Sequence, residues 1–98
     1  MKVDFETRLV DLSGIAINDS EGKPAALRGV VIDALLAQFK DEPNLSGEEK
    51  VKRFILAEKI FKGETEVSAE DVSLIKKLIG KAYNPLIVGQ AWQILEGK

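Results

Sequence analysis

Residues 46–63 read SGEEKVKRFILAEKIFKG, and this stretch predicts a helix over residues 47–62. Ser46 and Glu49 form a capping box, in which each side chain accepts the backbone N–H of the other at the start of a helix. Lys59 and Lys62 lie in the expected last turn, where the helix dipole favours cations, and Gly63 suits the end. The apolar positions of this helix are Val51, Phe54, Ile55, Ala57, Ile60 and Phe61.

Apolar residues at helical spacing predict three more helices, over residues 25–39, 69–82 and 85–96. Pro24 suits the start of the first, Ser68 and Asp71 form a second capping box, and Asn84-Pro85 separates the last two. The helix over residues 85–96 is apolar on most sides, so we expect it to be central in the bundle and Trp92 to be buried. Glycines within helices, at positions 80 and 89, predict a close approach of two backbones there.

The first residues follow a different pattern. Apolar and polar residues alternate around Val3 and Phe5 and again around Ile15 and Ile17, with turn-forming residues at 11–14 and 18–22. We therefore expect a β-hairpin with strands near residues 3–10 and 14–18, which leans on the helices because a lone hairpin is only marginally stable. The predicted fold is α+β, mostly α: one domain over residues 1–98, with a β-hairpin in residues 1–22 packed on a compact four-helix region in residues 23–98.

Composition excludes several classes of protein. The chain of 98 residues has a net charge of −2, no cysteine and no histidine. Disulfides, thiolate zinc sites and histidine-based catalysis are therefore excluded, and we expect no enzyme activity, no catalytic residues, no metal site and no cofactor. No stretch has the length and hydrophobicity of a membrane span or a signal peptide, so we expect a cytoplasmic protein without a membrane partner.

Charge is unevenly distributed along the chain. Residues 1–49 hold ten acidic and five basic side chains, and residues 50–98 hold six acidic and nine basic ones. If the helices over residues 47–62 and 69–82 are neighbours, their cations form a basic face: Lys52, Arg53, Lys59, Lys76, Lys77 and Lys81. Such a face indicates either a nucleic-acid-binding regulator or an ordinary solvated surface. Because the net charge is negative, we do not expect nucleic acid as a partner.

A second candidate surface lies where the last two helices meet. Tyr83 and Leu86 flank the Asn84-Pro85 turn, and an aromatic ring beside an apolar side chain is typical of interface anchors. Ile32 and Leu36 lie off the main apolar stripe of their helix and extend this surface. The alternative is that the hairpin covers these four residues.

Two segments carry a resemblance to a known group of proteins. LSGEEKVKRFILAEKI (residues 45–60) and VSAEDVSLIKKLIGKAYNPLIVGQAW (residues 67–92) resemble small uncharacterised proteins encoded by tailed bacteriophages and prophages, as do the turns DLSG (11–14) and DSEGKP (19–24). The resemblance implies the cytoplasm of a bacterial host and a role in phage development or particle assembly. It assigns no functional residues. We therefore expect a non-enzymatic phage or prophage protein that binds another phage protein, a host protein or a second copy of itself.

Overall fold

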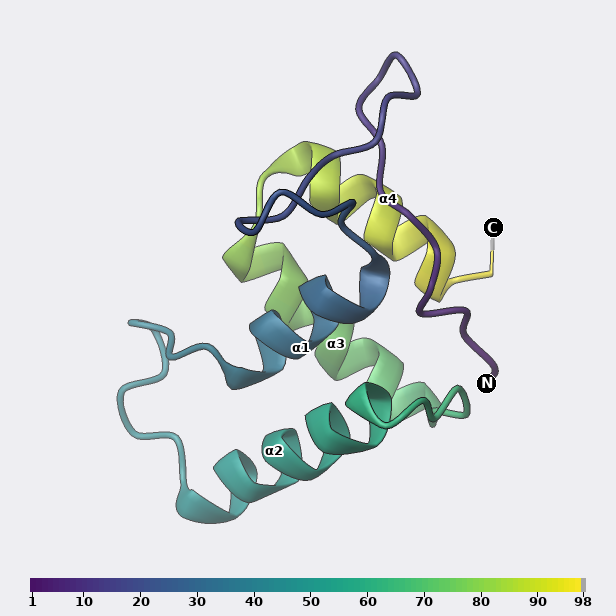
Figure 1. Ribbon diagram of the computed structural model, residues 1–98. Coiled ribbons are helices and arrows are strands. Elements are labelled where there is room, and N and C mark those ends of the chain that lie inside the picture. Colours follow the sequence, from purple (N-terminus) through teal and green to yellow (C-terminus); the bar gives the residue numbers. More distant parts are fainter. Residues whose placement is uncertain (98) are drawn as a thin grey trace.

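The computed structural model describes residues 1–97, which are mostly helical. Four helices lie within them (Figure 1): α1 (Leu27–Leu36), α2 (Gly47–Phe61), α3 (Ala69–Ala82) and α4 (Pro85–Leu95). The predicted helices are confirmed, and the caps lie where the sequence placed them. Ser46 Oγ accepts the Glu49 N–H at 3.1 Å and Ser68 Oγ accepts the Asp71 N–H at 3.0 Å. No helix of the described part is long and apolar enough to cross a membrane.

The first helix is shorter than predicted at both ends. Ala25 donates its N–H to the Ile17 carbonyl and accepts the Leu9 N–H, so this residue belongs to the pairing of the N-terminal segment. Ala37 is already extended, with ψ of 152°. Phe39 therefore packs against the core from the connection to α2 and not from the helix.

The predicted N-terminal hairpin is not confirmed. Residues 1–26 form isolated antiparallel bridges, of which the three within this segment are Arg8–Ala26, Val10–Ala16 and Asn18–Pro24. Leu9, Ile17 and Ala25 form a ring of backbone hydrogen bonds: Leu9 donates to Ala25, Ala25 to Ile17 and Ile17 to Leu9. Each of these three residues donates its N–H to one neighbouring segment and accepts an N–H from the other. No two segments therefore form the continuous ladder of hydrogen bonds that a hairpin needs.

Two turns of the same geometry join these three segments. Asp11 Oδ1 accepts the N–H groups of Ser13 and Ile15 at 2.8 and 3.0 Å, and Gly14 follows with φ of +85°. In the second turn Asp19 Oδ1 accepts two N–H groups at 2.9 and 3.0 Å, and Gly22 has φ of +79°. Each aspartate thus holds its own turn, and the first turn projects from the top of the molecule in Figure 1.

The core lies around α1 and α3. α1 packs against both α2 and α3, and α3 also packs against α4. The expectation that α4 is the central helix is wrong, because α4 buries one face, formed by Ile87, Ala91 and Leu95. Trp92 lies at the edge of the contact with α3, where its Nε1 donates to the Lys76 carbonyl at 3.1 Å, and because it is 37% exposed the expectation that it is buried is wrong.

The glycines of α3 and α4 differ from each other. A methyl group at Gly80 would meet the Trp92 ring at 3.7 Å, whereas one at Gly89 would meet nothing within 4 Å. The close approach of two backbones expected at these glycines is therefore wrong at both positions, because Gly80 faces a side chain and Gly89 faces open space.

Long-range hydrogen bonds attach the N-terminal segment to the helices and to the α2–α3 connection. The amide of Gln90 in α4 accepts the Val10 N–H at 2.9 Å and donates to the Val10 carbonyl, as a neighbouring strand would. Val3 donates its N–H to Thr65 in the α2–α3 connection at 2.9 Å. Val3, Phe5 and Leu9 are consequently buried in the same core as the helices.

Candidate functional site

The outer face of α2 carries large apolar side chains, interrupted by Glu58, and is uncovered in the described structure. Its inner face buries Arg53, Leu56, Ala57 and Ile60. The opposite face carries large exposed apolar side chains at helical spacing, which we call the outer stripe: Val51, Phe54, Ile55 and Phe61, exposed by 54, 55, 44 and 71%. Figure 1 shows α2 along the lower edge of the molecule, with α1 above it.

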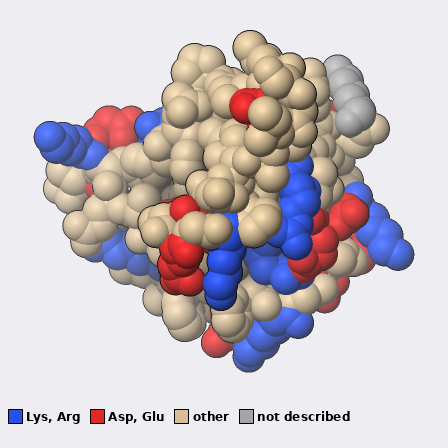
Figure 2. All heavy atoms as spheres, turned by 45° about the horizontal axis from the view of Figure 1, so that its top comes forward, with Lys and Arg blue, Asp and Glu red and all other residues tan. Residues whose placement is uncertain are grey.

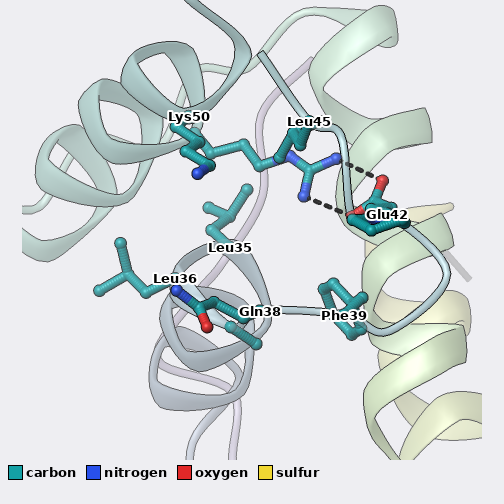
Figure 3. Close-up of a pocket in the computed structure, with 10 residues that line it drawn as sticks. Leu35, Leu36, Gln38, Phe39, Glu42, Leu45 and Lys50 are labelled. Atoms are coloured by element: carbon teal, nitrogen blue, oxygen red, sulfur yellow. Dashed lines mark hydrogen bonds and ion pairs between the residues drawn. The ribbon is translucent and has the colours of Figure 1, made fainter. Parts of the chain in front are cut away.

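A cavity of about 350 Å³ lies beside this helix, between α2 and the connection that follows α1. Leu36, Phe39 and Leu45 supply apolar lining, and Lys50 and Arg53 line it from α2. In Figure 3 Leu36 and Lys50 lie on one side of the cavity and Glu42 on the other. Its apolar lining suits an apolar side chain of a partner.

The charged groups of this cavity neutralise one another. Arg53 donates from both terminal nitrogens to the two oxygens of Glu42, at 2.9 and 2.8 Å, and the two side chains are 5 and 13% exposed. Lys81 lies 3.4 Å from the same carboxylate. The hydrogen bonds from Arg53 lower the pKa of Glu42 from 4.5 to about 2. This arrangement stabilises a folded connection and keeps the Glu42 carboxylate ionised at neutral pH.

The predicted surface at the α3–α4 corner is only partly exposed. Tyr83 and Ile32 are half-buried and pack against the core, and Leu86 is half-buried as well. Burial, together with the charge of Asp33, raises the pKa of the Tyr83 phenol, so this ring lies close to α1. Leu36, in contrast, is 55% exposed and belongs to the cavity beside α2.

The six cations of the predicted basic face do not form a continuous surface. Arg53 is buried, so its assignment to a surface is wrong. Lys76 pairs with Glu96 at 3.0 Å and lies over the Trp92 ring, and Lys81 pairs with Asp41 at 3.2 Å.

Of the remaining cations, Lys52 and Lys59 have acidic neighbours, and Lys77 lies apart from these two on α3. Lys52 and Lys59 line a shallow groove together with Glu49, Glu70 and Asp71, and Lys77 is exposed on α3. On the face drawn in Figure 2 blue and red spheres lie beside one another, and the upper part is almost free of charge. Lys52, Lys76 and Lys81 therefore have acidic partners, which weakens the field of these cations.

Among residues 1–97, no cluster of acidic side chains is arranged to hold a metal ion. The chain matches no protein-family model, no curated protein and no solved structure. The outer stripe is consequently interpreted from its own geometry.

Sequence reasoning listed the residues of the outer stripe without separating them from the core. At 100° per residue, Val51, Phe54, Ile55 and Phe61 occupy the arc opposite Leu56, Ala57 and Ile60. The sequence pattern that indicates a second apolar face is therefore the presence of two opposed apolar arcs on one helix.

Proposed function

We propose that this chain is a non-enzymatic protein that acts by binding another protein through the outer stripe. The observation that carries the proposal is the row of four large apolar side chains on the solvent side of α2. A monomer gains nothing from keeping such a row in water, and contiguous apolar surface with a polar rim is typical of a protein interface.

The surroundings of the stripe support a protein partner. Lys50, Lys52, Lys59 and Glu48 surround it with a charged rim, and the cavity lined by Leu36 and Lys50 lies beside it. An interface of this composition has an apolar centre that excludes water and a rim that sets orientation.

The class of partner rests on the sequence resemblance of residues 45–60 and 67–92. We take the partner to be a phage protein, a second copy of this chain included, or a host protein in a bacterial cytoplasm, with a role as an assembly factor or as a binder of a host factor. No contact within residues 1–97 favours the alternative of a nucleic-acid-binding regulator, because most of its proposed cations have acidic neighbours.

Site-specific photo-crosslinking tests the proposal in cells that produce the protein. A photoreactive phenylalanine analogue replaces Phe54 or Phe61 in the stripe and, as a control, Leu12, which is 97% exposed outside it. We expect protein adducts from both stripe positions and none from Leu12. Adducts that are equally frequent at Leu12, or an absence of protein adducts at both stripe positions, would overturn the proposal.

A further inference from the structure

The outer stripe has the form of a helix–helix contact. Its residues recur at intervals of three, four and seven along a helix of 15 residues, which is about 22 Å long. The inner side of α2 packs on α1, whereas its outer side is open along the helix. A second helix laid along this side would meet Val51, Phe54 and Ile55 together, and Phe61 beyond the charged pair of Glu58 and Lys62.

The area of the stripe sets the strength of such a contact. With about 200 Å² for a phenylalanine side chain, exposures of 55 and 71% leave roughly 250 Å² on Phe54 and Phe61. Val51 and Ile55 enlarge this to roughly 400 Å², the size of the largest apolar patch on a typical monomer, which is often functional. The patch is smaller than the ~800 Å² that each partner of a standard interface buries, so we expect micromolar affinity.

The charges at the two ends of α2 complement each other. Glu48 and Glu49 lie in the first turn, and Lys59 and Lys62 lie at the other end. If two copies of α2 lie antiparallel, each acidic end meets the basic end of the other copy, and the helix dipoles also oppose. A parallel pair would bring acid against acid and base against base.

The charges along the helix fit the same antiparallel arrangement. Placing Ile55 of one copy beside Ile55 of the other brings Glu48 opposite Lys62 and Lys52 opposite Glu58. Glu58 interrupts the stripe, but Lys62 of its own chain lies 3.8 Å from its carboxylate. This acid therefore enters the contact with a countercharge.

We propose that the partner of the outer stripe is a second copy of this chain, bound as a symmetric dimer with the two α2 helices antiparallel. This inference rests on the proposed function and names its partner. In a two-fold symmetric dimer every contact occurs twice, so one substitution changes two contacts.

Sedimentation over a range of concentration tests the dimer. We expect the purified chain to pass from its monomer mass of 10.8 kDa to twice that mass in the micromolar range. Phe54→Ser weakens dimerisation about a hundredfold because an aromatic ring is lost from each copy. Leu12→Ser removes an apolar side chain that lies outside the stripe and is more exposed than Phe54. This substitution leaves dimerisation unchanged.

Folding of each variant is checked by circular dichroism and Trp92 fluorescence. Phe54 contributes little to the core, so Phe54→Ser stays folded. A chain that sediments as a monomer up to millimolar concentration overturns the dimer, as does a dimer that Phe54→Ser leaves intact.

Charge reversal tests the antiparallel orientation. Glu48→Lys and Lys62→Glu each turn two attractive contacts repulsive, so each weakens self-association about tenfold. Combining both changes in one chain recovers part of the loss, because each new lysine meets a new glutamate of the other copy while Glu58 still lacks its Lys62 countercharge. In a parallel dimer the double variant would keep like charges together and would gain nothing from the combination.

The dimer and the proposed function fail in different ways. Adducts of Phe54 with a different protein, from a chain that is monomeric in sedimentation, overturn the dimer and leave the interaction function standing. A chain that neither self-associates nor forms adducts through the stripe overturns both.

Discussion

Glu42 shows how one residue holds the connection between α1 and α2. Its two oxygens accept hydrogen bonds from the nearly buried Arg53 guanidinium. Removing one member of such a pair leaves the other charge buried without compensation. We therefore expect Glu42→Gln to lower the free energy of unfolding by about 3 kcal/mol at neutral pH, as measured by urea denaturation.

The same pair makes stability depend on acid. Arg53 lowers the pKa of Glu42 from 4.5 to about 2 in the folded state. Above pH 4.5 the carboxylate is ionised in both states, and its full stabilisation is present. Between pH 4.5 and about 2 the unfolded chain binds a proton before the folded chain does. The free energy of unfolding therefore decreases as the pH is lowered through this range.

The control for Glu42 is its exposed neighbour. Asp41→Asn removes a carboxylate that is 63% exposed and lies 3.2 Å from Lys81, so it changes stability by less than about 0.5 kcal/mol. Glu42→Gln also flattens the fall in stability between pH 4.5 and 2. Equal effects of the two substitutions, or an unchanged pH profile in Glu42→Gln, would contradict this assignment.

Gln90 acts at the same scale by completing the backbone hydrogen bonds of Val10. Gln90→Ala leaves a half-buried N–H and carbonyl without these partners, so we expect it to cost about 1–3 kcal/mol. Gln93→Ala, at an exposed position of the same helix, is the matched control and changes little. Thermal or urea unfolding of the two variants separates them, and a loss of equal size in both would show that Gln90 is not special.

At the scale of elements, glycine has opposite effects in turns and helices. Gly14 has φ of +85°, which an L-residue adopts only with strain, so Gly14→Ala destabilises the protein by about 1 kcal/mol. Gly89 lies in α4 with open space around it, so Gly89→Ala stabilises the protein by about 0.5–1 kcal/mol. Thermal unfolding measures both, and two shifts of the same sign would show that one of these backbone assignments is wrong.

The element scale is also where prediction from sequence was most successful. The capping residues Ser46, Ser68 and Asn84 bond to N–H groups three positions away, so short stretches of sequence determine where three helices begin. The start of α1 was misplaced because Ala26 has no side-chain cap and Ala25 pairs with residues far along the chain.

At the scale of the whole molecule, the N-terminal segment is part of the core. Phe5 is 1% exposed and belongs to the same cluster as the helices. We expect Phe5→Ala to cost about 3–5 kcal/mol, which is a large share of the 5–15 kcal/mol typical of small domains. Circular dichroism and Trp92 fluorescence then lose their signals at the same denaturant concentration, because one core unfolds as a unit.

The alternative is an N-terminal segment that folds independently of the helices. In that case Phe5→Ala would cost less than about 1 kcal/mol and leave the helices intact. Separate midpoints for the two signals would support that alternative.

The sequence by itself determined the mostly helical composition, the approximate bounds of the helices and the exclusion of histidine and cysteine chemistry. These properties follow from residue types and from bonds that span at most one helical turn. The residues of the candidate surface were also readable as apolar, but not as exposed.

Tertiary structure decided which of two apolar arcs of α2 faces water. That choice depends on α1, which covers one arc, and on Glu42, which draws Arg53 to the same side from 11 residues away. The N-terminal segment is likewise held by Gln90, which lies 80 residues from Val10 along the chain. Whether a residue is buried, and with which distant residue it pairs, depends on the neighbours that it acquires on folding. Local sequence patterns do not identify those neighbours.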